Sequence, residues 1–259
     1  MPGRSSRRRV WLVLCPSSDV AGRWAFEGLR ARGLTPIDLV TSESLAYARW
    51  DHRVGSAGAS VSMDLPDGRS IRHDDVNGVL NRLAFVPGEA LTLIHQSDRE
   101  YVHQELNAFF ISWLHALPGP MLNPPTPQGL CGRMRYWSEW CHLAVRAGLP
   151  TAPYRQSSRE TAPPFALHAR APHSGPVITT VIVIGERVVG TAVPAPVAAA
   201  CARFATLART PILGVEFSTD RSQTWQFSGV TMLPDLRWGG DGAVDALAQA
   251  LCSSAVEAA

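Results

Sequence analysis

The chain has 259 residues, of which 46% are hydrophobic and 18% are charged, so it can bury a substantial core in one large or two small compact units. Its 24 basic Lys or Arg side chains are all arginine. This excludes chemistry that depends on a lysine Schiff base, a Walker-type phosphate lysine or a lysine general base. The formal net charge of +2 predicts no nucleic-acid partner and no membrane partner for the body of the protein.

The N-terminal residues and the cysteines predict a reduced, soluble protein. Residues 1–9 hold four arginines ahead of the first apolar run. We interpret them as a solvated basic tail, the alternative being an arm that contacts phosphates. The five cysteines are an odd number without CxxC spacing, which argues against a disulfide framework and a structural zinc site. Neither a signal peptide nor a run of about 18 apolar residues occurs, so a cytoplasmic protein is expected.

The first part of the chain has the pattern of a βαβ unit. Residues 10–15 are β-branched and apolar, which predicts a strand. After the following turn, the spacing of apolar residues fits a helix that ends at Gly33, and residues 37–40 predict a second strand. The turn lacks the GxGxxG fingerprint of dinucleotide-binding folds. The sequence therefore predicts a Rossmann-like N-terminal lobe over residues 10–120.

The remaining elements are a hairpin, a strand, two helices and an α/β unit that extends to the C-terminus. Asp67-Gly68 supplies the hairpin turn, Pro118-Gly119-Pro120 ends the first helix, and Gly148 with Pro150 ends the second. Residues 121–259 are expected to form a second lobe. The predicted ranges are strands at 61–65, 70–72 and 76–83, helices at 98–117 and 127–148, a polar linker at 151–164, strands at 165–169, 177–184 and 187–193, a helix at 196–210, strands at 214–218 and 224–227, and a helix at 244–254.

Several short motifs follow one another in a recognisable order. Leu122-Asn123-Pro124-Pro125 precedes a helix whose end reads Ala147-Gly148-Leu149-Pro150-Thr151-Ala152-Pro153. Further on, residues 181–190 combine an apolar run with Gly-Glu-Arg-Val-Val-Gly, and residues 213–217 read Leu-Gly-Val-Glu-Phe. Over almost its full length the chain resembles the ATP-grasp superfamily of carboxylate-amine ligases, particularly the branch of the ribosomal-protein glutamate ligase and related peptide-modifying ligases. The resemblance implies an α/β, ATP-grasp-like fold with a Rossmann-like N-terminal lobe and a C-terminal α+β lobe.

The positions that the resemblance assigns to the nucleotide phosphates depart from the family pattern. The family places a lysine in the helix before the Gly-Leu-Pro motif, and this position falls here near Arg133, Arg135 or Trp137. An arginine is able to clamp a phosphate. A second family lysine aligns with His168, whose neutral imidazole replaces an ammonium poorly. Only about ten residues separate His168 from Ile178, so the glycine-rich lid has no room and the central subdomain is expected to be truncated.

The magnesium positions implied by the resemblance are changed as well. Glu216 retains one candidate metal carboxylate. The motif that should supply the other ligands aligns with Ser228-Gly229-Val230, which offers neither a carboxylate nor an amide side chain. Magnesium binds through carboxylates, waters and substrate phosphates, so a single carboxylate makes a weak site. Residues 121–259 are therefore expected to form a degenerate ATP-grasp-like lobe without a cofactor.

Three functions remain open from the sequence. The first is an ATP-grasp-fold protein without a competent ATP site, which binds a peptide or a partner enzyme as an accessory factor in a peptide-modification or natural-product pathway. The second is an ATP-dependent peptide ligase with a divergent site, which uses ATP and Mg through Arg135 and Glu216. The third is a cofactor-independent enzyme with His168 or His103 as its catalytic residue.

Candidate substrate-binding residues are the cationic or imidazole side chains that the resemblance places at the cleft between the lobes: Arg82, Arg135, His168, Arg170 and Arg237. Guanidinium groups bind carboxylates in a bidentate manner. The alternatives are a surface or ion-paired arginine for Arg82, a shortened hairpin loop for residues 168–173 and an ordinary loop for Arg237. Cys141 and His142 are adjacent on a predicted helix and point in different directions, so we expect a buried cysteine and an exposed histidine.

Overall fold

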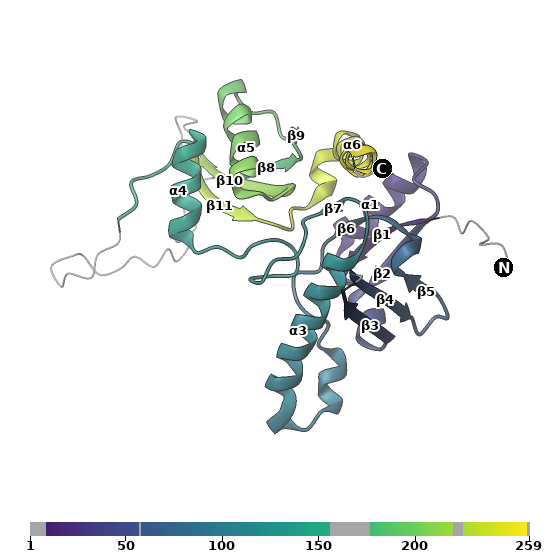
Figure 1. Cartoon of the computed structure of the whole chain (residues 1–259). Helices are drawn as coiled ribbons and strands as arrows, with labels where there is room; N and C mark the ends of the chain where they lie inside the picture. Colours follow the sequence, from purple (N-terminus) through teal and green to yellow (C-terminus); the bar gives the residue numbers. More distant parts are fainter. Residues whose placement is uncertain (1–8, 57, 156–176, 220–224, 258–259) are drawn as a thin grey trace.

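The computed structural model describes residues 9–56, 58–155, 177–219 and 225–257. They form two lobes that lie side by side, with α3 extending from the first lobe (Figure 1). The strand expected at 165–169, the length of the central subdomain, and the candidate residues His168 and Arg170 lie outside the described residues.

A four-stranded parallel sheet forms the centre of the first lobe, in the order β2-β1-β6-β7. Leu12 and Leu14 of β1 face a core shared with α3, whereas Val13 and Cys15 face a core shared with α1. Both faces of the sheet are therefore covered, as parallel sheets require, and the expected βαβ unit is confirmed. The bounds are β1 (Val10–Cys15), α1 (Val20–Ala31), β2 (Ile37–Thr41), β6 (Val76–Asn81), α3 (Arg99–Ala116) and β7 (Met121–Leu122).

A smaller antiparallel sheet, ordered β3-β4-β5, packs against α3 through Val61 and Met63. Its strands are β3 (Arg49–Gly55), β4 (Gly58–Asp64) and β5 (Ser70–Arg72), and α2 (Ser42–Ala46) precedes them. The hairpin predicted around Asp67-Gly68 is confirmed as the β4–β5 turn. The sequence did not predict β3, because this strand is exposed over most of its length and lacks an apolar run.

The second lobe is built on an antiparallel sheet in the order β11-β10-β8-β9. Apolar side chains from alternate positions, among them Val181, Val183 and Val215, form a core with Trp140 and Phe204 from the two helices on that face. The strands and helices of this lobe were predicted from these alternating and helical apolar patterns. The bounds are α4 (Trp137–Ala147), β8 (Val177–Ile184), β9 (Arg187–Gly190), α5 (Ala195–Ala208), β10 (Ile212–Thr219) and β11 (Trp225–Thr231).

The last helix, α6 (Gly240–Glu257), lies beside α1 of the first lobe (Figure 1). The two helices approach closely at Gly28, where an added Cβ would come 2.7 Å from a methyl carbon of Val244. Ile182 of β8 and Ile212 of β10 join the same core. The helix α6 thus packs between the two lobes, and β7 pairs with β6 in the first lobe; the division expected at residue 120 stays a prediction.

One helix prediction was wrong at its start. The helix expected from residue 127 begins at Trp137. Residues 123–136 are irregular, because three prolines and two glycines interrupt helix formation there. The helix ends as expected, with Gly148 in the left-handed conformation at φ 79°. Short 3₁₀ helices in the described residues are η1 (His73–Asp75), η2 (Glu89–Leu93), η3 (Gln96–Asp98) and η4 (Leu236–Gly239).

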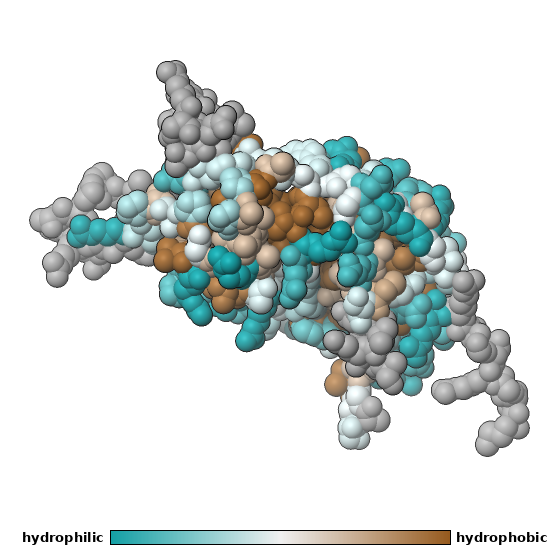
Figure 2. Space-filling model, turned by 90° about the horizontal axis from the view of Figure 1, so that it is seen from above, coloured by the Kyte–Doolittle hydropathy of each residue, from teal (hydrophilic) through white to brown (hydrophobic). Residues whose placement is uncertain are grey.

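The surface mixes polar and apolar side chains. Seen from above, apolar atoms gather near the middle of the face and hydrophilic ones surround them (Figure 2). Among the described helices, none combines the length and apolar character that crossing a membrane requires. Several large apolar side chains are exposed, and the most exposed of them include Phe85 at 78% and Leu93 at 79%.

Candidate functional site

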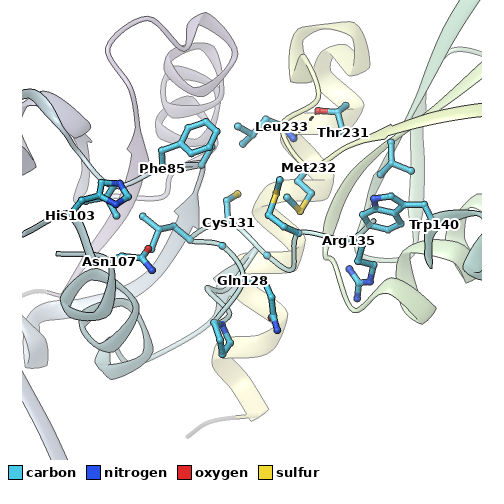
Figure 3. A pocket seen from close by; sticks show the side chains of 18 residues that line it. Phe85, His103, Asn107, Gln128, Cys131, Arg135, Trp140, Thr231, Met232 and Leu233 are labelled. Carbon is cyan, nitrogen blue, oxygen red and sulfur yellow. Dashed lines mark hydrogen bonds between the residues drawn. The ribbon is translucent and has the colours of Figure 1, made fainter. Parts of the chain in front are cut away.

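A pocket of about 590 Å³ lies where the two lobes meet. Its walls come from the loop after β6, from α3, from residues 127–135, from α4 and from the end of β11. Figure 3 shows the α3 side chains and Phe85 on one side, and the α4 and β11 side chains opposite. The lining residues labelled there are Phe85, His103, Asn107, Gln128, Cys131, Arg135, Trp140, Thr231, Met232 and Leu233.

Two buried asparagines hold the lobes and the pocket loop together. The Asn123 side chain accepts a hydrogen bond from the Ile212 amide at 2.8 Å, and it donates to the carbonyls of Ile212 at 3.0 Å and Met232 at 3.1 Å. The Asn81 amide donates to the carbonyls of Asn123 at 2.9 Å and Leu130 at 2.7 Å. Because these bonds connect the end of the parallel sheet to β10 and β11, they fix the distance between the pocket walls.

The mouth of the pocket is apolar and its floor is polar but unreactive. Phe85 and Met134 line it with 78% and 56% of their surface exposed. The Cys131 thiol donates to the Asn81 carbonyl at 3.1 Å. Burial raises the pKa of Cys131 to about 11, so at neutral pH it stays a thiol and not a nucleophilic thiolate. The arrangement suits an apolar ligand with polar backbone groups.

Two of the sequence-predicted residues line the pocket. His103 of α3 is exposed at its edge. The Arg135 Nη2 donates to the Ala208 carbonyl at 2.6 Å, and its guanidinium lies 4.9 Å from the centroid of the Trp140 ring. Burial, followed by the charge of Arg133, lowers the pKa of Arg135. Arg135 therefore satisfies the C-terminus of α5 while one side of it faces the pocket.

Arg82 does not line the pocket. Its side chain is 4% exposed and its Nε and Nη2 donate to the Asp19 carboxylate at 2.6 and 3.1 Å. The Asp19 carboxylate thus pairs with the Nε and Nη2 groups, whereas the buried Nη1 has no hydrogen-bond partner among the described residues, and binding of a substrate carboxylate by Arg82 stays a prediction. The alternative of an ion-paired arginine is confirmed, although the pair is buried.

Arg237 is also paired within the chain. It donates to both carboxylate oxygens of Asp235, at 2.8 and 2.6 Å, and this bonding holds the pKa of Asp235 below its ordinary value. The pair uses the Nε and Nη2 groups, and 47% of the Arg237 side chain is exposed, so substrate binding by Arg237 stays a prediction. Cys141 is buried and His142 exposed, as expected from their adjacent helix positions.

Glu216 lies on β10 directly opposite Gly229 of β11. An added Cβ on Gly229 would lie 2.3 Å from the Glu216 Oε2 atom, so the carboxylate already fills the space in which a second side chain would stand. Among the described residues, no three His, Cys, Asp or Glu side chains come together as a metal-binding group. The described residues thus present one carboxylate here, which makes a weak site for a magnesium ion that is held by carboxylates, waters and substrate phosphates.

The β1–α1 turn, where Rossmann-like folds bind phosphate, is occupied by this chain's own Glu43. The Ser17 hydroxyl donates to this carboxylate at 2.6 Å, and the Ser17 amide lies 3.2 and 3.1 Å from its two oxygens. Burial raises the pKa of Glu43, but the bonds from Ser17 outweigh it and lower the pKa to about 2. The Glu43 carboxylate of this chain is thus the anion that the turn binds.

This depressed pKa predicts a pH dependence of stability. Glu43 stabilises the fold above its ordinary pKa of 4.5, and this contribution is lost as the pH falls from there toward about 2. We expect Glu43→Gln to lower the urea midpoint at pH 7, with the difference from the unmodified protein disappearing in that acidic range. Glu27→Gln, in an exposed pair with Arg30, is the control. A pH-independent difference would contradict the assignment.

The chain matches no protein-family model and no curated protein. It is similar to the crystal structure of macrocyclase MdnC bound with precursor peptide MdnA from Microcystis aeruginosa MRC, with a TM-score of 0.73 at 11% identity over 95% of this chain and 100% of that chain. A Chryseobacterium gregarium RiPP-associated ATP-grasp ligase, in complex with ADP and a leader and core peptide, has a TM-score of 0.68 at 9% identity over 95% and 97%. Macrocyclase MdnB from Microcystis aeruginosa MRC has a TM-score of 0.67 at 16% identity over 94% and 99%. The expected α/β fold class is confirmed.

Proposed function

We propose that this chain, which has the ATP-grasp fold, binds a peptide in the pocket between its lobes and does not consume ATP. It would act as an accessory factor in a peptide-modification pathway. Two of the similar structures contain a precursor peptide or a leader and core peptide, which supports a peptide as the ligand here.

The observation that carries this proposal is the pairing of Glu216 with Gly229. Phosphoryl transfer depends on cations and metal ions that offset charge on the phosphates. Strands β10 and β11 present one carboxylate, that of Glu216, which lies against the glycine opposite it. One carboxylate is a weak anchor for such a metal. The apolar mouth and the neutral thiol of the pocket support binding without chemistry.

Titration calorimetry with Mg-ATP separates this proposal from a working ligase. We expect no saturable heat at millimolar nucleotide, because the described residues offer neither a lysine nor a set of metal ligands. Saturable binding at micromolar nucleotide would contradict the proposal and favour an ATP-dependent ligase.

Peptide binding is tested by selecting short random peptides on the full chain and measuring their affinities by fluorescence anisotropy. We expect Phe85→Ala to weaken the selected peptides by about tenfold, because truncating an aromatic contact at an interface costs about 1–2 kcal/mol. Leu93→Ala is the matched control, since Leu93 is equally exposed but does not line the pocket. Equal losses in both variants, or no selected peptide, would contradict the proposal.

A further inference from the structure

The strand β3 is a free edge of the small antiparallel sheet in the first lobe (Figure 1). Among the described strands it pairs only with β4, and the pairing runs from Arg49 to Gly55 without a register shift. The strand has neither the proline nor the bulge that commonly protects a sheet edge. Its outward amide and carbonyl groups are therefore a regular template for a further strand.

The two faces of β3 carry different side chains. Trp50 stacks on Phe109 of α3 with ring centroids 3.9 Å apart, and the His52 ring meets Phe109 edge-on at 5.6 Å. Because side chains alternate along a strand, Asp51 and Arg53 lie on the opposite face, where both are exposed. A strand added at this edge therefore meets aromatic groups on one face and charges of both signs on the other.

The order of the charges makes β3 complementary to a second copy of itself. His52 is the midpoint of β3, so an antiparallel pair with its two-fold axis at His52 uses the whole strand. In this register Asp51 of each copy lies opposite Arg53 of the other. Opposite charges across two strands stabilise a sheet, whereas like charges destabilise it. Moving the axis by one residue, to Asp51 or to Arg53, would place identical charges against each other.

The same register covers apolar surface that a single chain exposes. Trp50 is 49% exposed and Val54 is 72% exposed. With the axis at His52, Trp50 of each copy lies opposite Val54 of the other. An aromatic ring and a β-branched side chain form a favourable cross-strand pair, and the removal of apolar surface from water favours association.

We propose that two copies of this chain associate through their β3 strands, in antiparallel register about a two-fold axis at His52. The contact joins two three-stranded sheets into one continuous sheet. It uses the same patch of both copies and is therefore complete at two copies. Asp51 and Arg53, which pair within one chain at 2.8 Å, then also pair between chains. This association is independent of the proposed peptide binding, because β3 does not line the pocket.

Sedimentation velocity of the full chain over a range of concentrations tests this proposal. We expect the unmodified protein to form a dimer. Asp51→Arg and Arg53→Asp should each raise the dissociation constant about tenfold or more, because each reversal places two like-charge pairs at the shared edge. An equimolar mixture of the two variants should form a heterodimer, since arginines at both positions of one copy then face aspartates of the other. Native mass spectrometry distinguishes the heterodimer by its mass.

Asp67→Arg is the matched control. Asp67 is also exposed and pairs with the arginine two positions further on, Arg69, at 2.7 Å, but it lies in the β4–β5 turn and not on β3. This variant should keep the dissociation constant of the unmodified protein. A chain that stays monomeric at every concentration would overturn the proposal. So would a dimer that survives both reversals on β3, or a mixture of the two variants that does not associate.

Discussion

Asn123→Ala is expected to lower the free energy of unfolding by about 3–5 kcal/mol, because it leaves the Ile212 amide and the Ile212 and Met232 carbonyls without their bonds across the lobe boundary. Residue 123 also has a φ of 58°, a conformation that Asn adopts more readily than Ala. Urea unfolding followed by circular dichroism measures the loss.

The control for this change is Asn77→Ala. Asn77 lies on β6 like Asn81, but its side chain makes a single bond of 3.3 Å to the Arg9 carbonyl, so a loss below about 1 kcal/mol is expected. Similar losses for both variants would show that the Asn123 network does not hold the lobes. We also expect Asn123→Ala to weaken peptide binding, because the same bonds position the pocket loop.

Asp19→Ala is expected to destabilise the protein by about 4–6 kcal/mol. It removes the partner of a guanidinium whose side chain is 4% exposed, and breaking a buried pair in this way typically costs about 3–5 kcal/mol. The Asp19 side chain also accepts the Gly22 amide at 2.9 Å as the N-cap of α1, which adds about 1 kcal/mol. The free energy of unfolding in urea is the measurement.

The double variant Asp19→Ala with Arg82→Met tests whether the unpaired Arg82 charge causes this loss of stability. Removing the unpaired charge should recover part of the stability, whereas a double variant less stable than Asp19→Ala would show that the guanidinium is not the source of the loss.

The control is Asp241→Ala, which breaks a pair with Arg32 in which the aspartate side chain is 92% exposed. It should leave the midpoint nearly unchanged, since exposed pairs contribute little.

Much of the architecture followed from local patterns in the sequence. The βαβ unit, the Asp67-Gly68 hairpin and the Gly148 helix end each depend on residues within a few positions of one another. The strand β3 was missed because its stability comes from pairing with β4 and from the Trp50 ring stacked on Phe109 at 3.9 Å. That contact joins residues far apart in the chain, so no local apolar periodicity predicts it.

The candidate site was predicted less well than the fold. Arg135 and His103 do line the pocket, but Arg82 and Arg237 are paired with carboxylates of the chain. Of the residues that hold the pocket walls, Asn123 had no signal beyond its place in the Leu-Asn-Pro-Pro motif, and Asn81 had none beyond its place in a predicted strand. A buried asparagine and an exposed one look alike in a sequence, because only the surrounding fold shows which carbonyls it reaches.

The sequence by itself determined the α/β class and the order of most helices and strands, because apolar periodicity and turn residues act over short distances. It also excluded lysine chemistry. The ATP-grasp-like fold followed from the resemblance of its ordered motifs to that superfamily. Only the tertiary structure decided that Arg82 meets Asp19, 63 positions away, that Asn123 bridges to Ile212, 89 positions away, and that Glu216 lies over Gly229. Those pairings depend on strand register and on the packing of the two lobes, which are set by contacts between distant parts of the chain.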